Sequence, residues 1–184
     1  HMDTSDSIPL EETLEALGEL VRQGKVRQIG LSNETPWGTM KYLELAETKS
    51  LPRVASIQNA YNLVNRGFEI GLSEVAMHEQ VGLLAYSPLA QGTLTGKYLG
   101  GQMPQGSRLA LFGDGPLMMR YKGDKTQQAI EMYVNLAKKY EIDPAQLAIQ
   151  FCNIQPFVTS TIIGATTMEP VSYTHLRAHE TMVD

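Results

Sequence analysis

The sequence has a single cysteine and no long apolar run, and each shortage excludes a class of protein. Cys152 alone cannot form an intramolecular disulfide or a cysteine-rich zinc site, which is typical of proteins from a reducing compartment. No apolar stretch approaches the roughly 20 residues that span a bilayer, and the N-terminus lacks the apolar core of a signal peptide. We therefore expect a cytoplasmic protein with no membrane partner.

Positive charge is also in short supply. The chain has 15 Lys and Arg residues against 20 Asp and Glu residues, which gives a net charge of −5 and argues against a nucleic-acid partner.

The chain is also short. Its 184 residues fall below the roughly 200 that the smallest complete (β/α)₈ barrels need. A hydrophobic fraction of 42% still suffices for a globular core. We therefore expect one domain that is not a closed barrel.

The two ends of the chain look unlike the rest. The first two residues resemble the remnant of a cleaved expression tag, so we treat residues 1–7 as an extension. Residues 171–184 resemble a translated sequencing adapter, which leaves residues 8–170 as the expected domain. The tail offers a candidate metal site at His175, His179 and Glu180, because histidines at i and i+4 share one helix face. No further ligand converges on them, so we predict no metal site.

Helical and strand patterns alternate between these ends, as in βαβ units with a parallel sheet. Apolar segments predict four strands, at residues 26–31, 54–58, 82–86 and 157–163. Amphipathic segments predict five helices, at residues 10–23, 36–48, 68–78, 126–140 and 144–154. Thr35 and Asp143 each precede a proline and are expected to cap the helices that follow them. The fold class is therefore α/β.

Residues 88–125 interrupt this alternation. The segment holds eight glycines and three prolines and is far longer than an ordinary connection between a strand and a helix. Unstructured segments of this length in a small domain are usually functional or disordered. Its Lys97 and Arg108 are cations suited to phosphate.

Polar residues follow each predicted strand at its carboxyl end, where α/β folds bind ligands. They are Ser32, Asn33, Gln58, Asn59, Tyr86, Ser87 and residues 164–167. The amides and hydroxyls suit a carboxamide, and the Tyr86 ring offers a face for stacking. Each signal has a structural alternative, because Ser-Asn often forms a turn, tyrosine often lies in a core and Lys97 could be a solvated surface residue. Together they favour a ligand that combines a carboxamide, a flat ring and phosphate.

Five segments resemble the C-terminal half of an aldo-keto reductase, in the branch related to the potassium-channel β subunits. They are KVRQIGLSNET, SIQNAYNLVNR, LLAYSPLAQGTLTGKY, IDPAQLAI and IIGATTM, and the resemblance covers residues 8–169. It implies a partial TIM (β/α)₈ barrel, in which the C-terminal four strands and their helices form a half barrel. It also implies that NADP(H) binds in an extended form without a Rossmann domain, and the sequence indeed has no G-x-G-x-x-G fingerprint.

Carried over position by position, the resemblance implies a row of cofactor contacts along the carboxyl ends of the strands. Nicotinamide carboxamide contacts fall on Ser32, Asn33 and Gln58, and stacking on Tyr86. Pyrophosphate contacts fall on Ser87, Leu89 and Gln91, with Lys97 and Arg108 folding over the cofactor. Contacts to the 2′-phosphate and adenosine fall on Gly164 and Thr166. The family's adenine-binding residues are replaced by Pro170, Tyr173 and Thr174, which leaves the choice between NADPH and NADH open.

The family reduces small aldehydes and ketones reversibly, with a tyrosine acid, a lysine, an aspartate and a histidine that belong to the four strands before this segment. We therefore assign no catalytic residue. His78 ends a helix at the opposite face, and Tyr61 is expected in a loop without a lysine or carboxylate partner. We interpret the chain as the cofactor-binding half of such a reductase, inactive by itself. The alternatives are a nucleotide-binding sensor module and a truncated product without independent function.

A half barrel leaves two unpaired strand edges and one face of the sheet uncovered. Unpaired edges favour pairing with another chain. We expect the uncovered face to be apolar, and such faces do not stay exposed in water. These features predict a homo-oligomer, most simply a two-fold dimer that closes two half barrels.

Overall fold

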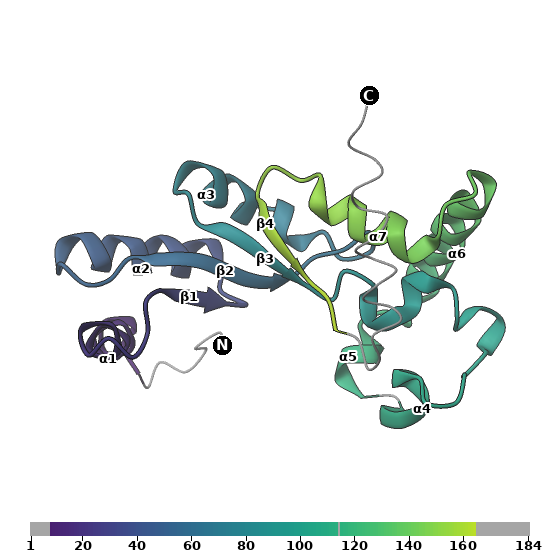
Figure 1. The fold of residues 1–184 in the computed structure, drawn as a ribbon, viewed down its shortest axis with the longest axis horizontal. Coiled ribbons are helices and arrows are strands. Elements are labelled where there is room, and N and C mark those ends of the chain that lie inside the picture. The colour runs from purple at the N-terminus through teal and green to yellow at the C-terminus, as the bar shows by residue number, and fades with distance from the viewer. Residues whose placement is uncertain (1–7, 114, 165–184) are drawn as a thin grey trace.

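Four parallel strands form one sheet in the order β1-β2-β3-β4 in the computed structural model, which describes residues 8–113 and 115–164 (Figure 1). The strands are β1 (Ile29–Ser32), β2 (Val54–Ala60), β3 (Gly82–Tyr86) and β4 (Val158–Ile162). Each pair of neighbours is parallel, and helices connect successive strands. The predicted α/β class is confirmed, and the arrangement is that of a partial TIM barrel.

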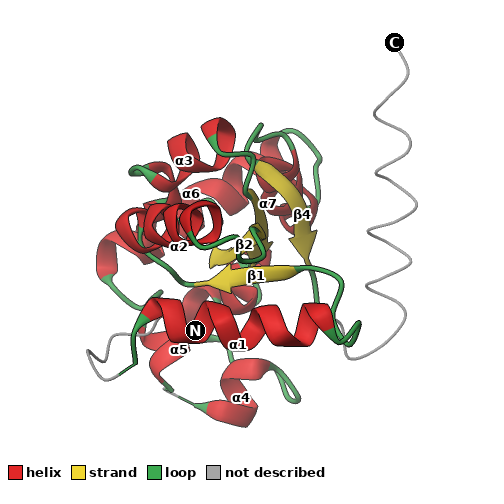
Figure 2. Ribbon diagram, turned by 90° about the vertical axis from the view of Figure 1, so that its left-hand side faces the viewer, coloured by secondary structure: helices red, strands yellow, loops and turns green. Residues whose placement is uncertain are grey.

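The principal helices lie where the apolar periodicity predicts them. They are α1 (Leu10–Arg22), α2 (Pro36–Thr48), α3 (Leu72–His78), α6 (Asp124–Lys139) and α7 (Pro144–Asn153). Both predicted caps are present, because Thr35 Oγ1 accepts a hydrogen bond from Gly38 N at 3.0 Å and Asp143 Oδ1 accepts one from Ala145 N at 2.8 Å. Helix α1 packs on α2, and α6 packs on α7 (Figure 2).

Three predicted segments differ from the structure more than the others do. The first strand starts at Ile29 rather than at residue 26, because the chain after α1 closes a turn in which Lys25 N donates to Leu20 O. The predicted helix 68–78 is divided into a 3₁₀ turn at Gly67–Glu69 and α3, because Gly71 adopts a φ of 93°. Residues 88–125 contain four short helical segments, which are Ala90–Thr95, Leu99–Gly101, α4 (Arg108–Phe112) and α5 (Pro116–Met119).

One face of the sheet packs against helices, and the other, here called the open face, is not covered by a helix of the described residues. Ile57, Leu83 and Ala85 are buried in the main core with residues of α1, α2 and α3. Side chains alternate along a strand, so the open face carries the intervening positions. Neighbours in register there form one row of Gly30, Ser56 and Gly82, a second row of Ser32, Gln58, Leu84 and Ser160, and a third row of Ala60, Tyr86 and Ile162. The first two rows are mostly small and polar and the third is mostly apolar, so the face is mixed rather than apolar as expected.

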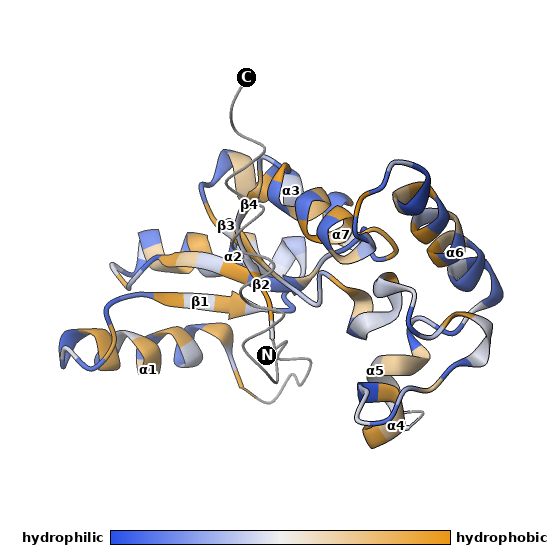
Figure 3. Ribbon diagram, turned by 45° about the vertical axis from the view of Figure 1, so that its right-hand side comes forward, coloured by the Kyte–Doolittle hydropathy of each residue, from blue (hydrophilic) through white to orange (hydrophobic). Residues whose placement is uncertain are grey.

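A second, smaller core holds the long segment after β3. Leu94, Tyr121, Ile130 and Val134 are its larger members, so the 3₁₀ segment Ala90–Thr95 and Tyr121 pack on α6 and α7. Apolar and polar positions alternate visibly along α6 (Figure 3). The arrows of β1 and β2 point toward this part of the molecule (Figure 1). The segment therefore lies beyond the carboxyl ends of the strands.

No helix in the part of the chain that the structure describes is long and apolar enough to cross a membrane.

Candidate functional site at the carboxyl ends of the strands

Asn33 occupies a tight turn directly after β1. Its backbone is left-handed, with a φ of 56°, a conformation that asparagine tolerates better than most residues. The Asn33 N–H donates to two acceptors, Gln58 O and Asn59 Oδ1, each at 2.9 Å. Its side-chain Nδ2 donates to Ser32 Oγ at 3.2 Å. The turn is therefore attached to the neighbouring strand and not only to its own chain.

Tyr86 ends β3 and reaches across β2 to this turn. Its hydroxyl donates to Asn33 Oδ1 at 2.7 Å, and its backbone oxygen accepts from Tyr61 N at 3.2 Å. The ring is half-buried and lies on the open face, one row beyond Gln58. Three strand ends are thus connected through one asparagine.

Gln58 lies between these groups with its amide available. It is the register partner of Ser32 on one side and of Leu84 on the other, and it is half-buried. Within the described residues, no hydrogen bond to its side-chain amide is found. A half-buried primary amide offers both a donor and an acceptor in one plane. Gln58 can therefore pair with a carboxamide of a ligand.

The chain reverses direction immediately after β3. Ser87 has a φ of 55°, and Ala90, Gln91 and Gly92 follow with φ values of 49°, 62° and 92°. Gln91 Nε2 donates to Ser87 Oγ at 2.8 Å, which folds this turn back on itself. Leu89 is partly buried and packs against the second core. Three of the residues expected along the pyrophosphate thus share one compact turn.

The two expected phosphate-binding cations lie further along the same segment. Lys97 packs over this turn, since a Cβ added to Gly92 would lie 2.9 Å from Lys97 Cε, and its Nζ lies 5.2 Å from the centroid of the Tyr98 ring. Arg108 is the first residue of α4 and is exposed. Neither cation forms an ion pair with a carboxylate of the described residues. Both charges are therefore available to an anion.

The remaining predicted positions lie at or beyond the end of the described chain. Gly164 is exposed, two residues after β4, and Thr166 lies outside the described residues. The tail side chains His175, His179 and Glu180 also lie outside them. Residues 8–113 and 115–164 contain no group of three or more His, Cys, Asp or Glu side chains that could hold a metal ion.

Tyr61 lies in a different environment from the one expected, because it does have a carboxylate partner. Its hydroxyl donates to Glu69 Oε1 at 2.6 Å, and Arg66 Nε donates to the same oxygen at 2.7 Å. Tyr61 is fully buried and packs on the rings of Phe151 and Phe157. Burial, followed by the hydrogen bond to Glu69, raises the pKa of the Tyr61 phenol. A buried phenol with a raised pKa is a poor proton donor, so this tyrosine serves the core.

The lone cysteine shares that core. Cys152 is fully buried, and its Sγ lies 3.5 Å from Tyr61 O. Burial raises the pKa of its thiol to about 12. The thiolate is the reactive form of cysteine, so Cys152 is a packing residue.

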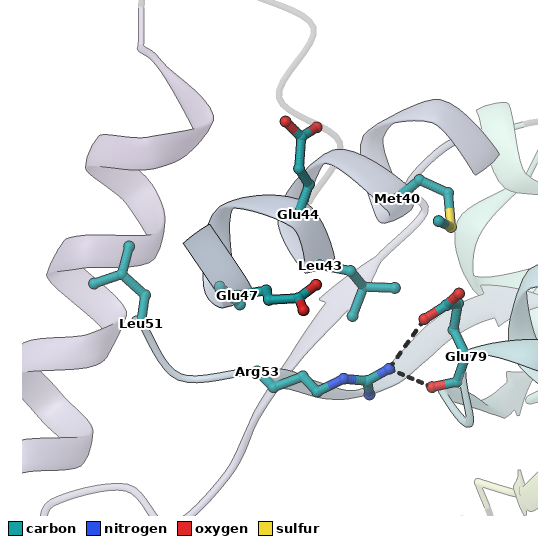
Figure 4. Close-up of a pocket in the computed structure, with 8 residues that line it drawn as sticks. Met40, Leu43, Glu44, Glu47, Leu51, Arg53 and Glu79 are labelled. Atoms are coloured by element: carbon teal, nitrogen blue, oxygen red, sulfur yellow. Dashed lines mark hydrogen bonds and ion pairs between the residues drawn. The ribbon is translucent and has the colours of Figure 1, made fainter. Parts of the chain in front are cut away.

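A groove on the outer surface lies away from the predicted contacts (Figure 4). It is lined by residues of α2 and by the segments that enter β2 and β3, namely Met40, Leu43, Glu44, Ala46, Glu47, Leu51, Arg53 and Glu79. Arg53 bridges to the carboxylate and the backbone oxygen of Glu79. The segments at Arg53 and Glu79 precede their strands, whereas barrel sites lie at the opposite, carboxyl end. The groove is therefore separate from the candidate site.

Two asparagines contribute to the site in ways the sequence did not reveal. Asn59 is recognisable from the sequence only as a polar residue at a strand end, whereas its Oδ1 holds the Asn33 turn. Asn62 gave no signal, yet it is fully buried and donates to Ser87 O at 2.9 Å and to Tyr121 Oη at 3.1 Å. Both contacts join segments distant in sequence, so local patterns could not have identified them.

Comparison with known proteins identifies the family to which the chain belongs. Residues 2–175 match the model of the aldo/keto reductase family. The chain is 52% identical over 167 residues to Protein tas of Escherichia coli (strain K12), an alignment that covers 91% of this chain and 47% of that protein. It is 34% identical over 167 residues to L-glyceraldehyde 3-phosphate reductase of the same organism, with 89% and 48% covered.

A third relative is a probable voltage-gated potassium channel subunit beta of Oryza sativa subsp. japonica. The identity is 33% over 159 residues, with 86% of this chain and 48% of that protein covered. The chain therefore spans about half the length of these three relatives. The family match over most of the chain, together with the four parallel strands and their helices, shows that this chain belongs to the aldo/keto reductase family.

Proposed function

We propose that the chain is the cofactor-binding half of an NADP(H)-dependent aldo-keto reductase, whose parent reaction is the reversible reduction of small aldehydes and ketones by hydride transfer. The observation that carries the proposal is the cluster of Ser32, Asn33, Gln58 and Tyr86 at three adjacent strand ends. The Gln58 amide, which has no hydrogen-bond partner among the described residues, and the Tyr86 ring are suited to a flat aromatic carboxamide. A relative that is named as a reductase of a carbonyl compound agrees with this assignment.

The residues present fit a nicotinamide nucleotide. Gln58, Ser32 and Asn33 would hold the carboxamide, and Tyr86 would support the ring. Ser87, Leu89 and Gln91 would line the pyrophosphate path, where Lys97 and Arg108 contribute positive charge that no carboxylate of the described residues pairs. Gly164 and Thr166 would begin the adenosine pocket. When bound, the cofactor supplies the hydride, and this chain's residues orient the nicotinamide that carries it.

We expect no carbonyl reduction by the chain alone. The reaction needs a group that protonates the carbonyl oxygen as hydride arrives. Tyr86 uses its hydroxyl proton in the bond to Asn33, and Tyr61 is buried with a raised pKa. Neither tyrosine is suited to that role.

Titration of the 184-residue chain with NADPH tests the assignment, with the fluorescence of the reduced nicotinamide as the signal. Binding should occur, and Gln58→Ala should weaken it about fivefold, the effect of losing roughly 1 kcal/mol of hydrogen bonding. Gln128→Ala, which removes an exposed glutamine of α6, is the matched control and should bind as the unchanged chain does. If NADPH does not bind, the remaining interpretation is that the chain is a truncated product without a function of its own.

The same mixture tests the expected inactivity. Adding an aldehyde should leave the NADPH absorbance constant, and consumption of NADPH that depends on the aldehyde would contradict the proposal. A separate chain that carries the first four strands of a related reductase should restore turnover. If nucleotide binds and such a chain never restores turnover, the sensor module becomes the better interpretation.

We also propose that the chain self-associates through its sheet edges. Strands β1 and β4 each have one strand neighbour within the described sheet, so each presents an edge for pairing. The first two rows of the open face are mostly small and polar, so edge pairing rather than apolar contact is the driving interaction. Light scattering should give about twice the chain mass of 20.3 kDa. A well-folded species at the mass of one chain would refute self-association.

A further inference from the structure

Asn59 is a polar residue at a strand end to which the family resemblance assigns no cofactor contact, yet it holds the turn that contains Asn33. Its Oδ1 and the backbone oxygen of Gln58 both accept the Asn33 N–H at 2.9 Å. Asn33 has a φ of 56°, a conformation that L-residues rarely adopt unless their surroundings hold them there. A side chain from β2 therefore stabilises an unusual backbone conformation after β1.

The orientation of the Asn33 side chain follows from this turn. Its Oδ1 accepts the Tyr86 hydroxyl at 2.7 Å, and its Nδ2 donates to Ser32 Oγ at 3.2 Å. Both ends of the amide are therefore held. A change in the Asn33 backbone would move the acceptor away from the Tyr86 hydroxyl.

Tyr86 is consequently fixed at two points. Its backbone is fixed by the sheet, where its oxygen accepts from Tyr61 N at 3.2 Å, and its hydroxyl is fixed by Asn33. Two fixed points define the direction in which the long axis of the ring points, whereas a ring held only at its backbone can swing about its Cα–Cβ bond. A ligand that must stack on the ring and pair with Gln58 at the same time benefits from a ring that is already in place.

We propose that Asn59 is a positioning residue that acts through the chain of hydrogen bonds Asn59–Asn33–Tyr86, here called the strand-end relay, to set the tilt of the Tyr86 ring for a nicotinamide. The proposal rests on the proposed cofactor-binding function. It assigns Asn59 no contact with the ligand, and it gives Asn33 a second role besides any contact with the carboxamide.

Four variants separate this role from a general structural one. Asn59→Ala removes the acceptor, whereas Asn59→Asp retains an oxygen at the same place. Tyr86→Phe removes only the hydroxyl and keeps the ring. Asn153→Ala is the matched control, because Asn153 Oδ1 also accepts one side-chain hydrogen bond, from Thr161 Oγ1 at 2.7 Å, but lies in α7 outside the site.

The first measurement uses the chain without ligand. In nuclear magnetic resonance spectra, Asn59→Ala should move the Asn33 amide proton upfield and speed its exchange with solvent, because one of its two acceptors is gone. Asn59→Asp should restore the original shift, and Asn153→Ala should not change it. An Asn33 amide that is unchanged in Asn59→Ala would overturn the relay, whether or not the chain binds nucleotide.

The second measurement is NADPH affinity. Asn59→Ala should raise the Kd about three- to tenfold, the effect of one hydrogen bond, and Asn59→Asp should recover most of the loss. Tyr86→Phe should weaken binding to a similar extent. The double variant should bind no more weakly than the weaker single variant, because both changes break the same relay. The positioning role would be overturned if the losses of binding free energy in Asn59→Ala and Tyr86→Phe added fully in the double variant, or if Asn59→Ala left the Kd unchanged.

Failure of the cofactor-binding function would give a different result. In that case the unchanged chain would not bind NADPH at all, and the Asn33 amide would still report directly on the relay.

Discussion

The strand ends and the segment at residues 87–122 both carry predicted ligand contacts, but they hold those contacts in different ways. At the strand ends, Asn33, Gln58 and Tyr86 lie on neighbouring strands whose register fixes their spacing. In residues 87–122, contacts such as Lys97 depend on short turns with several left-handed residues and on a small separate core. The amide end of the site is therefore built on the sheet, and the phosphate end is built on a connection.

This difference suits the two parts of a nucleotide. A carboxamide has fixed donor and acceptor directions and needs side chains at defined spacing. A phosphate group is satisfied by any nearby cation or N–H group, so a less regular segment can bind it. We expect the strand ends to resist local unfolding and residues 87–122 to open more easily, since they have fewer buried apolar contacts.

The largest expected effect comes from the main core. Leu83 is fully buried between the sheet and the helices, so Leu83→Ala should lower the free energy of unfolding by about 2–5 kcal/mol. Ile130→Ala is the matched change in the smaller core, where Ile130 is 1% exposed. Urea unfolding gives the global loss, and amide exchange gives its location. Ile130→Ala should speed exchange mainly in residues 87–122, and equal acceleration at β1 and β2 would show that the two regions unfold as one unit.

Asn62 connects the two regions, and its replacement should destabilise residues 87–122 more than the strand ends. Its side chain connects the segment after β2 to Ser87 O and Tyr121 Oη, and its Oδ1 accepts from Val64 N at 3.0 Å. Asn62→Ala removes the donor to the buried Tyr121 hydroxyl and one of the two donors to Ser87 O, which should cost about 1–3 kcal/mol. Exchange should accelerate around Ser87 and Tyr121 more than around Asn33. Asn135→Ala, which removes an exposed asparagine of α6, should change neither region.

The fold was largely predictable because it depends on local patterns. The β3 strand Gly82–Tyr86 and the α2 helix agree with the residues predicted for them, since an apolar run and a Thr-Pro cap are local signals. The break at Gly71 was not predicted, because the apolar spacing continues across it. The short helices in residues 88–125 have no amphipathic period long enough to detect.

The candidate site was predictable in composition but not in its connections. Ser32, Asn33, Gln58 and Tyr86 follow from the strand ends, and the structure brings them together. The relay through Asn59 and the role of Asn62 depend on the register between strands and on contacts 25 or more residues apart. The polar character of the open face also depends on register, because it follows only when Gly30, Ser56 and Gly82 are known to be neighbours.

Gly82 lies close to Thr159 of the neighbouring strand, and replacing it should lower the free energy of unfolding by a smaller amount. A Cβ added to Gly82 would lie 1.8 Å from Thr159 Oγ1 and 3.1 Å from its Cβ. Gly82→Ala should cost about 1 kcal/mol, the low end of the usual range for overpacking, because the threonine hydroxyl can rotate away. In a Thr159→Ala background the same change should cost much less. In contrast, a Cβ added to Gly106 would meet no atom of the described residues within 4 Å, so substitution there tests only its φ of 73°.

The smallest expected effect is a pH dependence carried by Glu69, which supports the main core from outside the site. The Arg66 guanidinium, followed by the Tyr61 hydroxyl, donates to this carboxylate and holds the pKa of Glu69 below its ordinary value. A carboxylate with a lowered folded-state pKa stabilises the fold above its unfolded-state pKa, and that contribution is lost as the pH falls through the folded-state value. Glu69→Gln lacks this titration, so its stability should fall less than that of the unchanged chain between pH 6 and pH 3, by a margin of about 1 kcal/mol or less. Urea midpoints at both pH values measure the margin, with Glu74→Gln as the control on α3. An equal loss of stability in the unchanged chain, Glu69→Gln and Glu74→Gln would mean that the Arg66–Glu69–Tyr61 contacts contribute nothing to the stability of the sheet region. The greater stability expected of the sheet region over residues 87–122 would then rest on apolar packing alone.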